Sequence, residues 1–340
     1  MTSSDTSLPS TAVVILNWNG EKLLAEFLPS VISNTSAADA TIIVADNGST
    51  DNSVMWLSQN YPDVKTILFD KNHGYAGGYN LVAEECKRRG YKYVMMLNSD
   101  VAPTQGWIAP LIDYMEHNPE CGACQPKILS YRDRTKFEYA GASGGYIDRN
   151  GYPFCRGRIF DSIEHDHGQY DSIAEVFWAS GAALMVRTSD YISAGGLDKA
   201  FFAHMEEIDL CWRMQLMGKK IAVVPQSVVY HLGGGSLDAK NARKTYLNFR
   251  NNLLMLHKNL PDSSRKSTLL RRRLLDTLAW SKYMVTLKFK HASAIFRAHR
   301  DFAKMRRLYA SHPDCDLLHT TPPRPNIITD YYIKGIKKWH

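Results

Sequence analysis

"YVMMLNSDV", residues 93–101, is an apolar run that ends abruptly in polar residues. The run shows no alternation of apolar and polar residues, so it predicts a strand that is buried on both faces. Asn98, Ser99 and Asp100 then stand at the carboxyl end of this strand, which is where open α/β sheets bind ligands. A metal–diphosphate site would be easier to accept with two acids, and this stretch has one. The polar residues are therefore either an ordinary strand exit or part of a site whose other ligands come from elsewhere in the chain.

The sequence around this strand alternates between strand and helix patterns. Strands are expected at 11–18, 41–46 and 64–70, and helices at 21–33, within 47–61 and at 77–90. This alternation predicts βαβ units and a parallel sheet, and hence an α/β fold. Further along the chain we expect hairpins and loops at about 121–175, a strand at 176–187, a helix at 208–218, a short strand at 220–225 and mostly helix from 237 to about 309.

Composition limits the number of domains and the location of the protein. The 340 residues are 44% hydrophobic, enough for one large domain or two smaller ones. No apolar stretch approaches the roughly 20 residues of a membrane span, and the polar residues 1–10 are not typical of a signal or transit peptide. We therefore expect a cytoplasmic protein with reduced cysteines. Cys121 and Cys124 form a C-x-x-C without a second pair, which favours two small buried residues over a zinc or redox site.

The net charge of +7 is concentrated near the C-terminus. Between Arg265 and Arg307 there are thirteen Lys or Arg residues against two acids, Asp276 and Asp301. Basic helices with apolar faces bind anionic membrane surfaces, and this is our interpretation of the segment. The alternatives are packing against the rest of the protein and a homodimer contact. A nucleic-acid partner is not favoured, because no RNA-binding motif accompanies the charge.

Two stretches in the first third of the chain are candidates for binding a nucleotide. "VADNGSTDNS" (44–53) places Asp46 at a strand end and Asn47 in the following turn, where they can meet a base, a ribose or a phosphate. The alternative is a helix N-cap cluster at 49–51. "NHGYAGGYN" (72–80) is expected to be a strand exit, in which Gly77 and Gly78 either let the backbone approach a ligand or form a turn. A dinucleotide fingerprint and a P-loop are both absent from the sequence.

Two later stretches carry candidate catalytic residues. "FFAHMEEIDLCWRMQLMG" (201–218) has Glu206 and Glu207 at a predicted helix start, embedded among apolar residues, so either could act as a general base. "VVYHLGGGS" (228–236) ends an apolar run on His231. A lone histidine is more often structural than a ligand, whereas the glycines after it suit a mobile loop that closes over a phosphate.

Taken together, seven ordered blocks resemble a family 2 glycosyltransferase of the GT-A fold, in the branch that contains rhamnosyltransferases. The resemblance covers about residues 10–255. The blocks are "VVILNWNG", "VADNGSTDNS", "NHGYAGGYN", "MLNSDV", "FWASGAALMVR", "GGLDKAFFAHMEEIDLCWR" and "VVYHLGGGS". The resemblance implies a GT-A catalytic domain at 1–255, with a mixed sheet flanked by helices, followed by a basic, mainly helical region at 256–340.

The resemblance also implies a donor site with a divalent metal. Asp46 would contact the pyrimidine base, and Asp100 would bind Mg²⁺ or Mn²⁺ on the diphosphate together with His231. Asn98 replaces the first acid of the family's D-x-D motif, which leaves Asp100 as the acidic ligand. The residues implied to bind the nucleotide sugar are Asn17, Asn19, Asp46, Asn47, Gly77, Gly78, Asn98, Ser99 and Asp100.

The reaction implied by the resemblance is an inverting sugar transfer. The donor would be dTDP-rhamnose or a UDP-hexose, and the acceptor a hydroxyl of a cell-surface glycan or of a polyprenyl-diphosphate-linked sugar. Glu207 would be the base, with Glu206 as the alternative, while Trp178, Ser180 and Gly181 would lie near the sugar and acceptor. Such an enzyme would be peripheral on the inner face of the plasma membrane. Because the D-x-D motif is weakened, a catalytically weak protein that binds nucleotide sugars is the second hypothesis.

Overall fold

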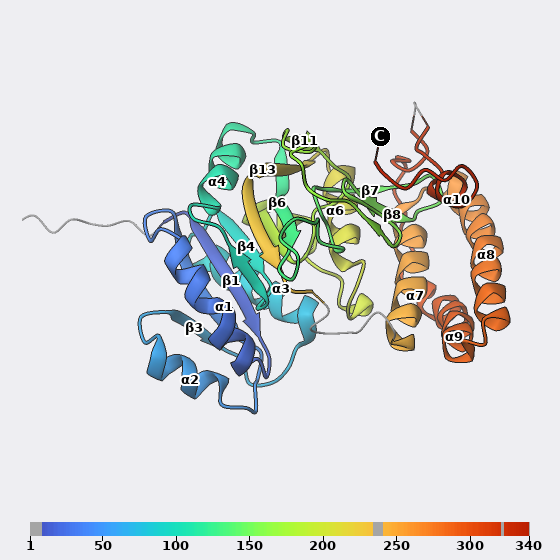
Figure 1. Cartoon of the computed structure of the whole chain (residues 1–340). Coiled ribbons are helices and arrows are strands. Elements are labelled where there is room, and N and C mark those ends of the chain that lie inside the picture. Colours follow the sequence, from blue (N-terminus) through green and yellow to red (C-terminus); the bar gives the residue numbers. More distant parts are fainter. Residues whose placement is uncertain (1–8, 234–240, 321–322, 340) are drawn as a thin grey trace, which may run out of the picture.

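A mixed sheet forms the centre of the molecule (Figure 1). The computed structural model describes residues 9–233, 241–320 and 323–339. In this part of the chain the sheet has the strand order β11-β13-β6-β12-β4-β1-β2-β3, and β5 pairs with β13. Its strands are β1 (Thr11–Asn17), β2 (Ala40–Asp46), β3 (Lys65–Leu68), β4 (Tyr93–Leu97), β5 (Val101–Pro103), β6 (Cys121–Ser130), β11 (Ala174–Glu175), β12 (Ala183–Arg187) and β13 (Lys220–His231).

The N-terminal half of the sheet is parallel, as the sequence predicts. β1 pairs in parallel with both β2 and β4, and β2 pairs in parallel with β3. Every residue of β4 is buried, which confirms the prediction for the apolar run 93–97. The register of β1 and β2 places Asn17 opposite Asp46, so two candidate site residues meet at the carboxyl edge of the sheet.

The other half of the sheet contains a strand that the sequence analysis missed. β12 runs antiparallel to both β4 and β6, and β13 runs parallel to β6. Residues 121–130 were expected to begin a region of hairpins and loops, but they form the ten-residue strand β6, which is buried except at Ser130. Lys127 is tolerated in this buried strand because its ammonium group lies 2.7 Å from Asp166 and 2.6 Å from Asp171.

Helices cover both faces of the sheet. On one face Leu24 and Leu111 pack with Met95, and on the other Val82 and Trp212 belong to the cluster that contains Met96. Successive residues of β4 therefore contribute to opposite faces, as expected for a strand buried on both sides. The helices are α1 (Glu21–Asn34), α2 (Ser53–Asn60), α3 (Gly74–Arg88), α4 (Ile108–His117), α5 (Thr188–Ser193) and α6 (Glu206–Leu216).

A smaller sheet and a group of helices complete the chain. The smaller sheet consists of β7 (Gly145–Ile147), β8 (Pro153–Cys155), β9 (Arg158–Ile159) and β10 (Ser162–Ile163). In Figure 1 the C-terminal helices stand beside the sheet at the right. They are α7 (Ala242–Asn259), α8 (Asp262–Val285), α9 (Phe289–Met305) and the short α10 (Ile327–Tyr332). Residue 255, the expected boundary, lies within α7. Among the described residues, no helix is both long and apolar enough to cross a bilayer.

Candidate active site

The nucleotide-binding candidates Asn17 and Asp46 are in direct contact. The side-chain amide of Asn17 donates to Asp46 Oδ1 over 2.9 Å, and the hydroxyl of Ser49 donates to the same oxygen over 2.6 Å. The backbone N–H of Ser49 donates to Asp46 Oδ2 over 2.9 Å. These bonds fix the carboxylate at the carboxyl ends of two parallel strands. Of the alternative N-cap cluster at 49–51, Asp51 accepts from the N–H of Ser53 at the start of α2, although the N-cap residue itself is Asn52.

Asn19 and Asn47 hold the surrounding loops together. Asn19 adopts a left-handed backbone conformation (φ 51°), and its side-chain oxygen accepts from the N–H of Thr50 over 2.7 Å. The side chain of Asn47 donates to the carbonyl of Gly74 over 3.1 Å and accepts from the N–H of His73 over 2.9 Å. The loops after β1, β2 and β3 are therefore joined into one edge beside Asp46.

Gly77 and Gly78 lie inside α3, in agreement with the helix expected at 77–90, so the strand exit expected over 72–80 is limited to its first residues. α3 begins at Gly74. A Cβ on Gly78 would lie 2.8 Å from both methyl carbons of Leu16, which means that glycine allows α3 to pack closely on β1. The structure thus gives Gly78 a packing role, and its binding to a donor stays a prediction, as does that of Gly77.

The proposed metal ligands Asp100 and His231 meet at the end of β4. His231 Nε2 lies 3.1 Å from Asp100 Oδ1, and both side chains are buried. Glu138, which the sequence analysis did not identify, lies on the other side of the imidazole with its Oε2 3.5 Å from His231 Nδ1. Its only sequence signal is an acid between two aromatic residues, Phe137 and Tyr139. Asn98 and Ser99 are half-buried beside this group.

The charges in this group stabilise one another. Burial alone would lower the pKa of His231, but the hydrogen bond to Asp100 and the nearby Glu138 raise it to about 10. Burial raises the pKa of Asp100, yet its hydrogen bond with His231 and the imidazolium charge bring that pKa below its usual value. Without a cation the group is therefore an imidazolium between two carboxylates.

The residues present fit a divalent cation that is completed by a substrate. Asp100 and His231 would hold the ion with a carboxylate oxygen and an imidazole nitrogen, which lie 3.1 Å from each other and are donor types that divalent cations accept. His231 Nδ1 has no hydrogen-bond partner among the described residues. Within those residues, no three or more His, Cys, Asp or Glu side chains form a metal-binding group by themselves. Phosphate oxygens and water would have to supply the other ligands. The expected mobile loop after His231 falls largely on residues 234–240, which lie outside the described residues.

Glu206, which is buried, and Glu207, which is half-buried, form the start of α6. The chain enters this helix through backbone conformations with positive φ at Phe202, His204 and Met205 (67°, 68° and 74°). Such conformations are strained for residues other than glycine and often occur at functional sites. The side chains of Asn251 and Arg250 on α7 hold this entry loop in place, since the amide of Asn251 donates to the carbonyls of residues 203 and 204 over 2.8 Å each.

The two glutamates differ in their protonation. Burial raises the pKa of Glu206 well above its usual value, and the charge of Glu207 adds to this effect. Burial also raises the pKa of Glu207, but backbone N–H groups at the helix start oppose this, and its pKa is about 7. Glu206 is therefore held neutral at pH 7, whereas Glu207 can give up and take up a proton near that pH. One carboxyl oxygen of each lacks a hydrogen-bond partner among the described residues.

Gly181 connects the glutamates to the metal-ligand candidates. A Cβ on Gly181 would lie 3.7 Å from Glu207 Cβ, and the hydroxyl of Tyr75 donates to the carbonyl of Gly181 over 2.8 Å. The next residue, Ala182, accepts a 2.9 Å hydrogen bond from the N–H of Asn98, two residues before Asp100. Tyr75 is a further site residue that lies in a quoted motif but received no role from the sequence.

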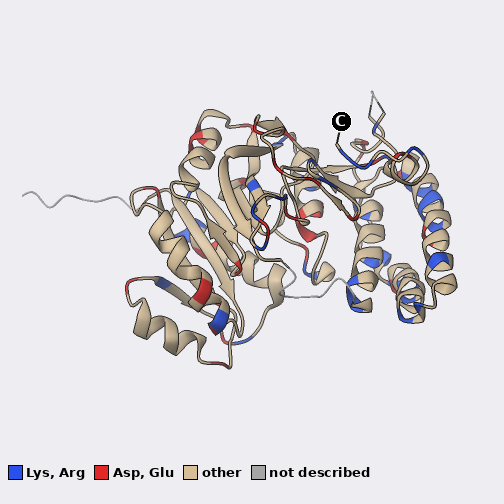
Figure 2. Ribbon diagram, in the orientation of Figure 1, with Lys and Arg blue, Asp and Glu red and all other residues tan. Residues whose placement is uncertain are grey.

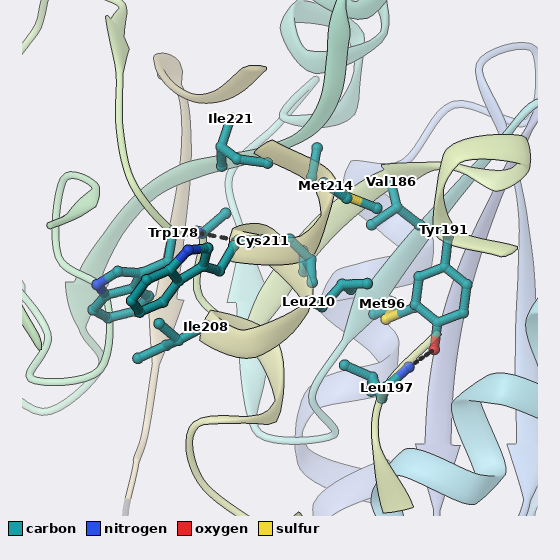
Figure 3. Packing of buried hydrophobic residues seen from close by; sticks show 14 of the residues in the cluster. Met96, Trp178, Val186, Tyr191, Leu197, Ile208, Leu210, Cys211, Met214 and Ile221 are labelled. Atoms are coloured by element: carbon teal, nitrogen blue, oxygen red, sulfur yellow. Dashed lines mark hydrogen bonds between the residues drawn. The ribbon is translucent and has the colours of Figure 1, made fainter. Parts of the chain in front are cut away.

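Trp178 and Ser180, expected near the sugar and acceptor, make internal contacts. Trp178 is 4% exposed, and its indole nitrogen donates to the carbonyl of Tyr146 over 2.9 Å. Figure 3 shows it packed beside Ile208 and Cys211. The hydroxyl of Ser180 donates to the carbonyl of Ala140 and accepts from the N–H of Ala182. These contacts give both side chains a role in holding the 178–182 segment, and a direct substrate contact stays a prediction.

The fold and the site together define a class of protein. A mixed sheet with donor-site candidates at the carboxyl ends of its parallel strands is the architecture of the GT-A glycosyltransferases. In agreement, the structure is similar to that of GalNAc-T7 with UDP, GalNAc and Mn²⁺, with a TM-score of 0.57 at 15% sequence identity. This similarity covers 76% of the present chain and 49% of that chain, so the chain spans about half of its length. The predicted GT-A fold is confirmed.

Sequence relatives identify the family. A family model described as glycosyl transferase family 2 matches residues 12–171. The N-acetylglucosaminyl-diphospho-decaprenol L-rhamnosyltransferase of Mycobacterium tuberculosis is 30% identical over 234 residues, which are 64% of this chain and 75% of the relative. Rhamnosyltransferase WbbL of Escherichia coli is 24% identical over 216 residues, 61% of this chain and 78% of the relative. The chain belongs to glycosyltransferase family 2 and is a glycosyltransferase, as the sequence motifs predict.

Proposed function

We propose that the protein transfers a sugar from a nucleoside-diphosphate donor to an acceptor hydroxyl with inversion at the anomeric carbon. One observation carries this proposal: the segment 180–182 lies against Glu207 on one side and against Asn98, two residues before Asp100, on the other. A candidate base and a candidate diphosphate site are thereby held on a common piece of backbone. This arrangement suits an inverting transfer, in which the base takes the proton of the acceptor hydroxyl as that hydroxyl attacks the anomeric carbon and the nucleoside diphosphate leaves.

In this proposal the donor is a pyrimidine nucleotide sugar, with dTDP-rhamnose as the first candidate and a UDP-hexose as the second. Support for rhamnose comes from the names of the two relatives. Asp46, fixed by Asn17 and Ser49, would accept from the base, while Asn19 and Asn47 keep the rim of this pocket in place. Asn98 can hydrogen-bond a ribose hydroxyl without adding charge to the site.

Asp100 and His231 would hold Mg²⁺ or Mn²⁺ on the donor diphosphate. When bound, such an ion neutralises the charge that develops on the leaving diphosphate. Glu138 helps to orient the imidazole through its contact with Nδ1 and adds negative charge near the ion. Asn98 replaces the first aspartate of the D-x-D motif, so Asp100 would be the one carboxylate ligand that the motif supplies.

Glu207 would act as the general base. Its pKa of about 7 places it between carboxylate and acid at neutral pH, which suits a group that takes the proton of an attacking hydroxyl. Glu206, held neutral beside it, limits the negative charge at the helix start. Gly181 leaves room next to the Glu207 side chain. A larger residue would reduce this room, because a Cβ at position 181 would lie only 3.0 Å from the hydroxyl of Tyr75.

The acceptor is proposed to be a lipid-linked sugar at the inner face of the plasma membrane. The Mycobacterium tuberculosis relative is named for a decaprenyl-diphosphate acceptor. In this chain, α8 exposes Leu270, Leu274 and Leu278, which are 61%, 63% and 67% exposed and recur every four residues on one face. Figure 2 shows that basic residues also lie along α8 and the neighbouring C-terminal helices. Exposed leucines flanked by positive charge suit an anionic membrane surface, whereas a homodimer contact would leave like charges facing each other.

A donor screen tests this function. Purified protein is incubated with UDP- and dTDP-sugars and either Mg²⁺ or Mn²⁺, and release of nucleoside diphosphate is followed with and without a sugar-diphosphate-lipid acceptor. We expect metal-dependent release from one donor that increases when the acceptor is added. Binding of a donor without turnover under any condition would favour the catalytically weak binding protein instead.

A further inference from the structure

A pocket of about 410 Å³ between α7 and α9 is lined mainly by arginines. Arg243 and Tyr246 come from α7, while Arg297, Arg300 and Asp301 come from α9. This pocket is not used in the reaction described above, which takes place at the edge of the main sheet.

The pocket carries excess positive charge. Its single carboxylate, Asp301, is already engaged, because Tyr246 donates to Oδ2 over 3.0 Å and Arg300 donates to Oδ1 over 3.1 Å. Three arginines against one aspartate leave a net charge of two positive units in the lining. Arg300 forms an ion pair with Asp301. Arg243 and Arg297 have no carboxylate partner among the described residues.

Two of the arginines make cation–π contacts with aromatic rings. The guanidinium carbon of Arg243 lies 4.9 Å from the centre of the Phe202 ring, and that of Arg297 lies 5.6 Å from the centre of the Tyr246 ring. Rings that orient planar guanidinium groups prepare them to bind phosphate oxygens in pairs. The chemistry of the pocket is therefore that of a phosphate or diphosphate site.

The pocket lies close to the loop that carries the proposed base. Phe202, whose ring lies under Arg243, belongs to the loop that leads into α6 and is five residues before the proposed base Glu207. Asn251, on the same helix as Arg243, holds the carbonyls of residues 203 and 204, and the eight-residue step from Arg243 to Asn251 spans about 12 Å along the helix. A ligand could thus place its phosphates in the pocket while its sugar lies at the loop.

We propose that Arg243 and Arg297, with Arg300, bind the diphosphate of the lipid-linked acceptor. This inference rests on the proposed function and adds the residues that would select a phosphorylated acceptor. The donor diphosphate is assigned to Asp100 and His231, which leaves the arginine pocket for a second phosphorylated substrate. Phe296, next to Arg297, is 67% exposed and offers an apolar surface where the lipid chain would continue.

Transfer to two matched soluble acceptors tests the inference. One is N-acetylglucosaminyl diphosphate with a short alkyl chain, and the other is the neutral alkyl glycoside of the same sugar, both assayed without vesicles. In Arg243→Gln/Arg297→Gln, we expect KM for the diphosphate acceptor to rise about 10- to 100-fold, with kcat and the KM of the neutral acceptor unchanged. The control Arg271→Gln/Arg273→Gln removes two exposed arginines of α8 outside the pocket and should match wild type for both soluble acceptors in this vesicle-free assay.

Three results would overturn the inference. The first is an unchanged KM for the diphosphate acceptor. The second is an equal rise in KM for both acceptors, which would mean that the substitutions disturb the 201–205 loop and not phosphate recognition. The third is loss of binding to anionic phospholipid vesicles with an unchanged KM, which would make the pocket a headgroup site.

Direct binding separates this inference from the proposed function. Calorimetry of the diphosphate acceptor with wild type and both double variants, without donor or metal, needs no turnover. Weaker binding only in Arg243→Gln/Arg297→Gln supports the pocket even if no donor is turned over, in which case the proposed function alone fails. Equal affinity for all three proteins overturns the inference.

Discussion

His231 Nε2 lies 3.1 Å from Asp100 Oδ1, although 131 residues separate the two in the sequence. The sheet brings them together, because β5 directly follows Asp100 and pairs antiparallel with the end of β13, where Val101 is opposite His231. The N–H of Leu232 also donates to the carbonyl of Asp100 over 3.0 Å. Two strand ends are thus joined at the point where the donor diphosphate is proposed to bind.

Replacing either member of this pair should abolish metal-dependent activity. Asp100→Asn and His231→Gln each remove one proposed ligand, so we expect nucleoside diphosphate release at saturating Mn²⁺ to fall about 100-fold or more. Donor affinity, measured by calorimetry, should lose its dependence on the metal. Asp113→Asn, an exposed aspartate on α4, is the matched control and should change neither quantity. Unchanged metal dependence in both site variants would contradict the assignment.

The pH dependence of the reaction should reflect Glu207. A base acts only when ionised, and because burial raises the pKa of Glu207 to about 7, the active carboxylate is lost as the pH falls through 7. We expect kcat/KM to be constant above this pH and to fall about tenfold for each unit below it. A profile that stays flat down to pH 5 would show that a glutamate with its ordinary pKa, or another group, is the base.

Trp178 should matter for stability more than for substrate affinity. Its ring fills the space beside Gly145, where a built Cβ would lie 2.1 Å from the indole. Trp178→Ala should therefore lower the free energy of unfolding by about 3–5 kcal/mol, measured by denaturant titration. Trp18→Ala, at an indole that is 56% exposed, is the control and should cost far less. Full stability of Trp178→Ala with a raised KM would restore the substrate contact implied by the resemblance.

The sequence predicted well the parts of the fold that depend on local pattern. β1, β2 and β4 are continuous apolar runs, and they pair in parallel as their pattern predicts, whereas the placement of Asn17 near Asp46 was implied only by the family resemblance. β6 was missed because Pro126 and Lys127 interrupt its apolar character, and its lysine is neutralised by two aspartates about 40 residues further along the chain. Such long-range pairing leaves no local signal.

In the candidate site, too, some residues could be predicted from the sequence and others depend on long-range contacts. The position of Asp100 beside His231 follows from the family resemblance, whereas Glu138 and Tyr75 occur in no pattern that assigns them chemistry. Their roles depend on the approach of separate segments, such as the 2.8 Å hydrogen bond from Tyr75 to Gly181, 106 residues away. Protonation could not be predicted either, since the difference between Glu206 and Glu207 arises from burial and from backbone N–H groups at the start of α6.

Membrane binding should depend on the leucine face of α8. In Leu270→Asn/Leu274→Asn/Leu278→Asn, the apolar area that would enter the interface is reduced, and we expect binding to anionic vesicles to weaken about tenfold or more in a flotation assay. Met55→Asn removes a 54% exposed side chain on α2 and serves as the control. Unchanged flotation of the triple variant would favour packing or dimer contact for this helix.

The most direct test of the account is the transfer rate of Glu207→Gln, measured beside Glu206→Gln and with donor affinity determined in parallel. Glutamine preserves the shape of each side chain but cannot accept the acceptor's proton. We predict that Glu207→Gln binds the donor as wild type does and transfers sugar about 10²- to 10⁴-fold more slowly, while Glu206→Gln stays within about tenfold of wild type because Glu206 is already neutral. A wild-type rate in Glu207→Gln would contradict the central claim.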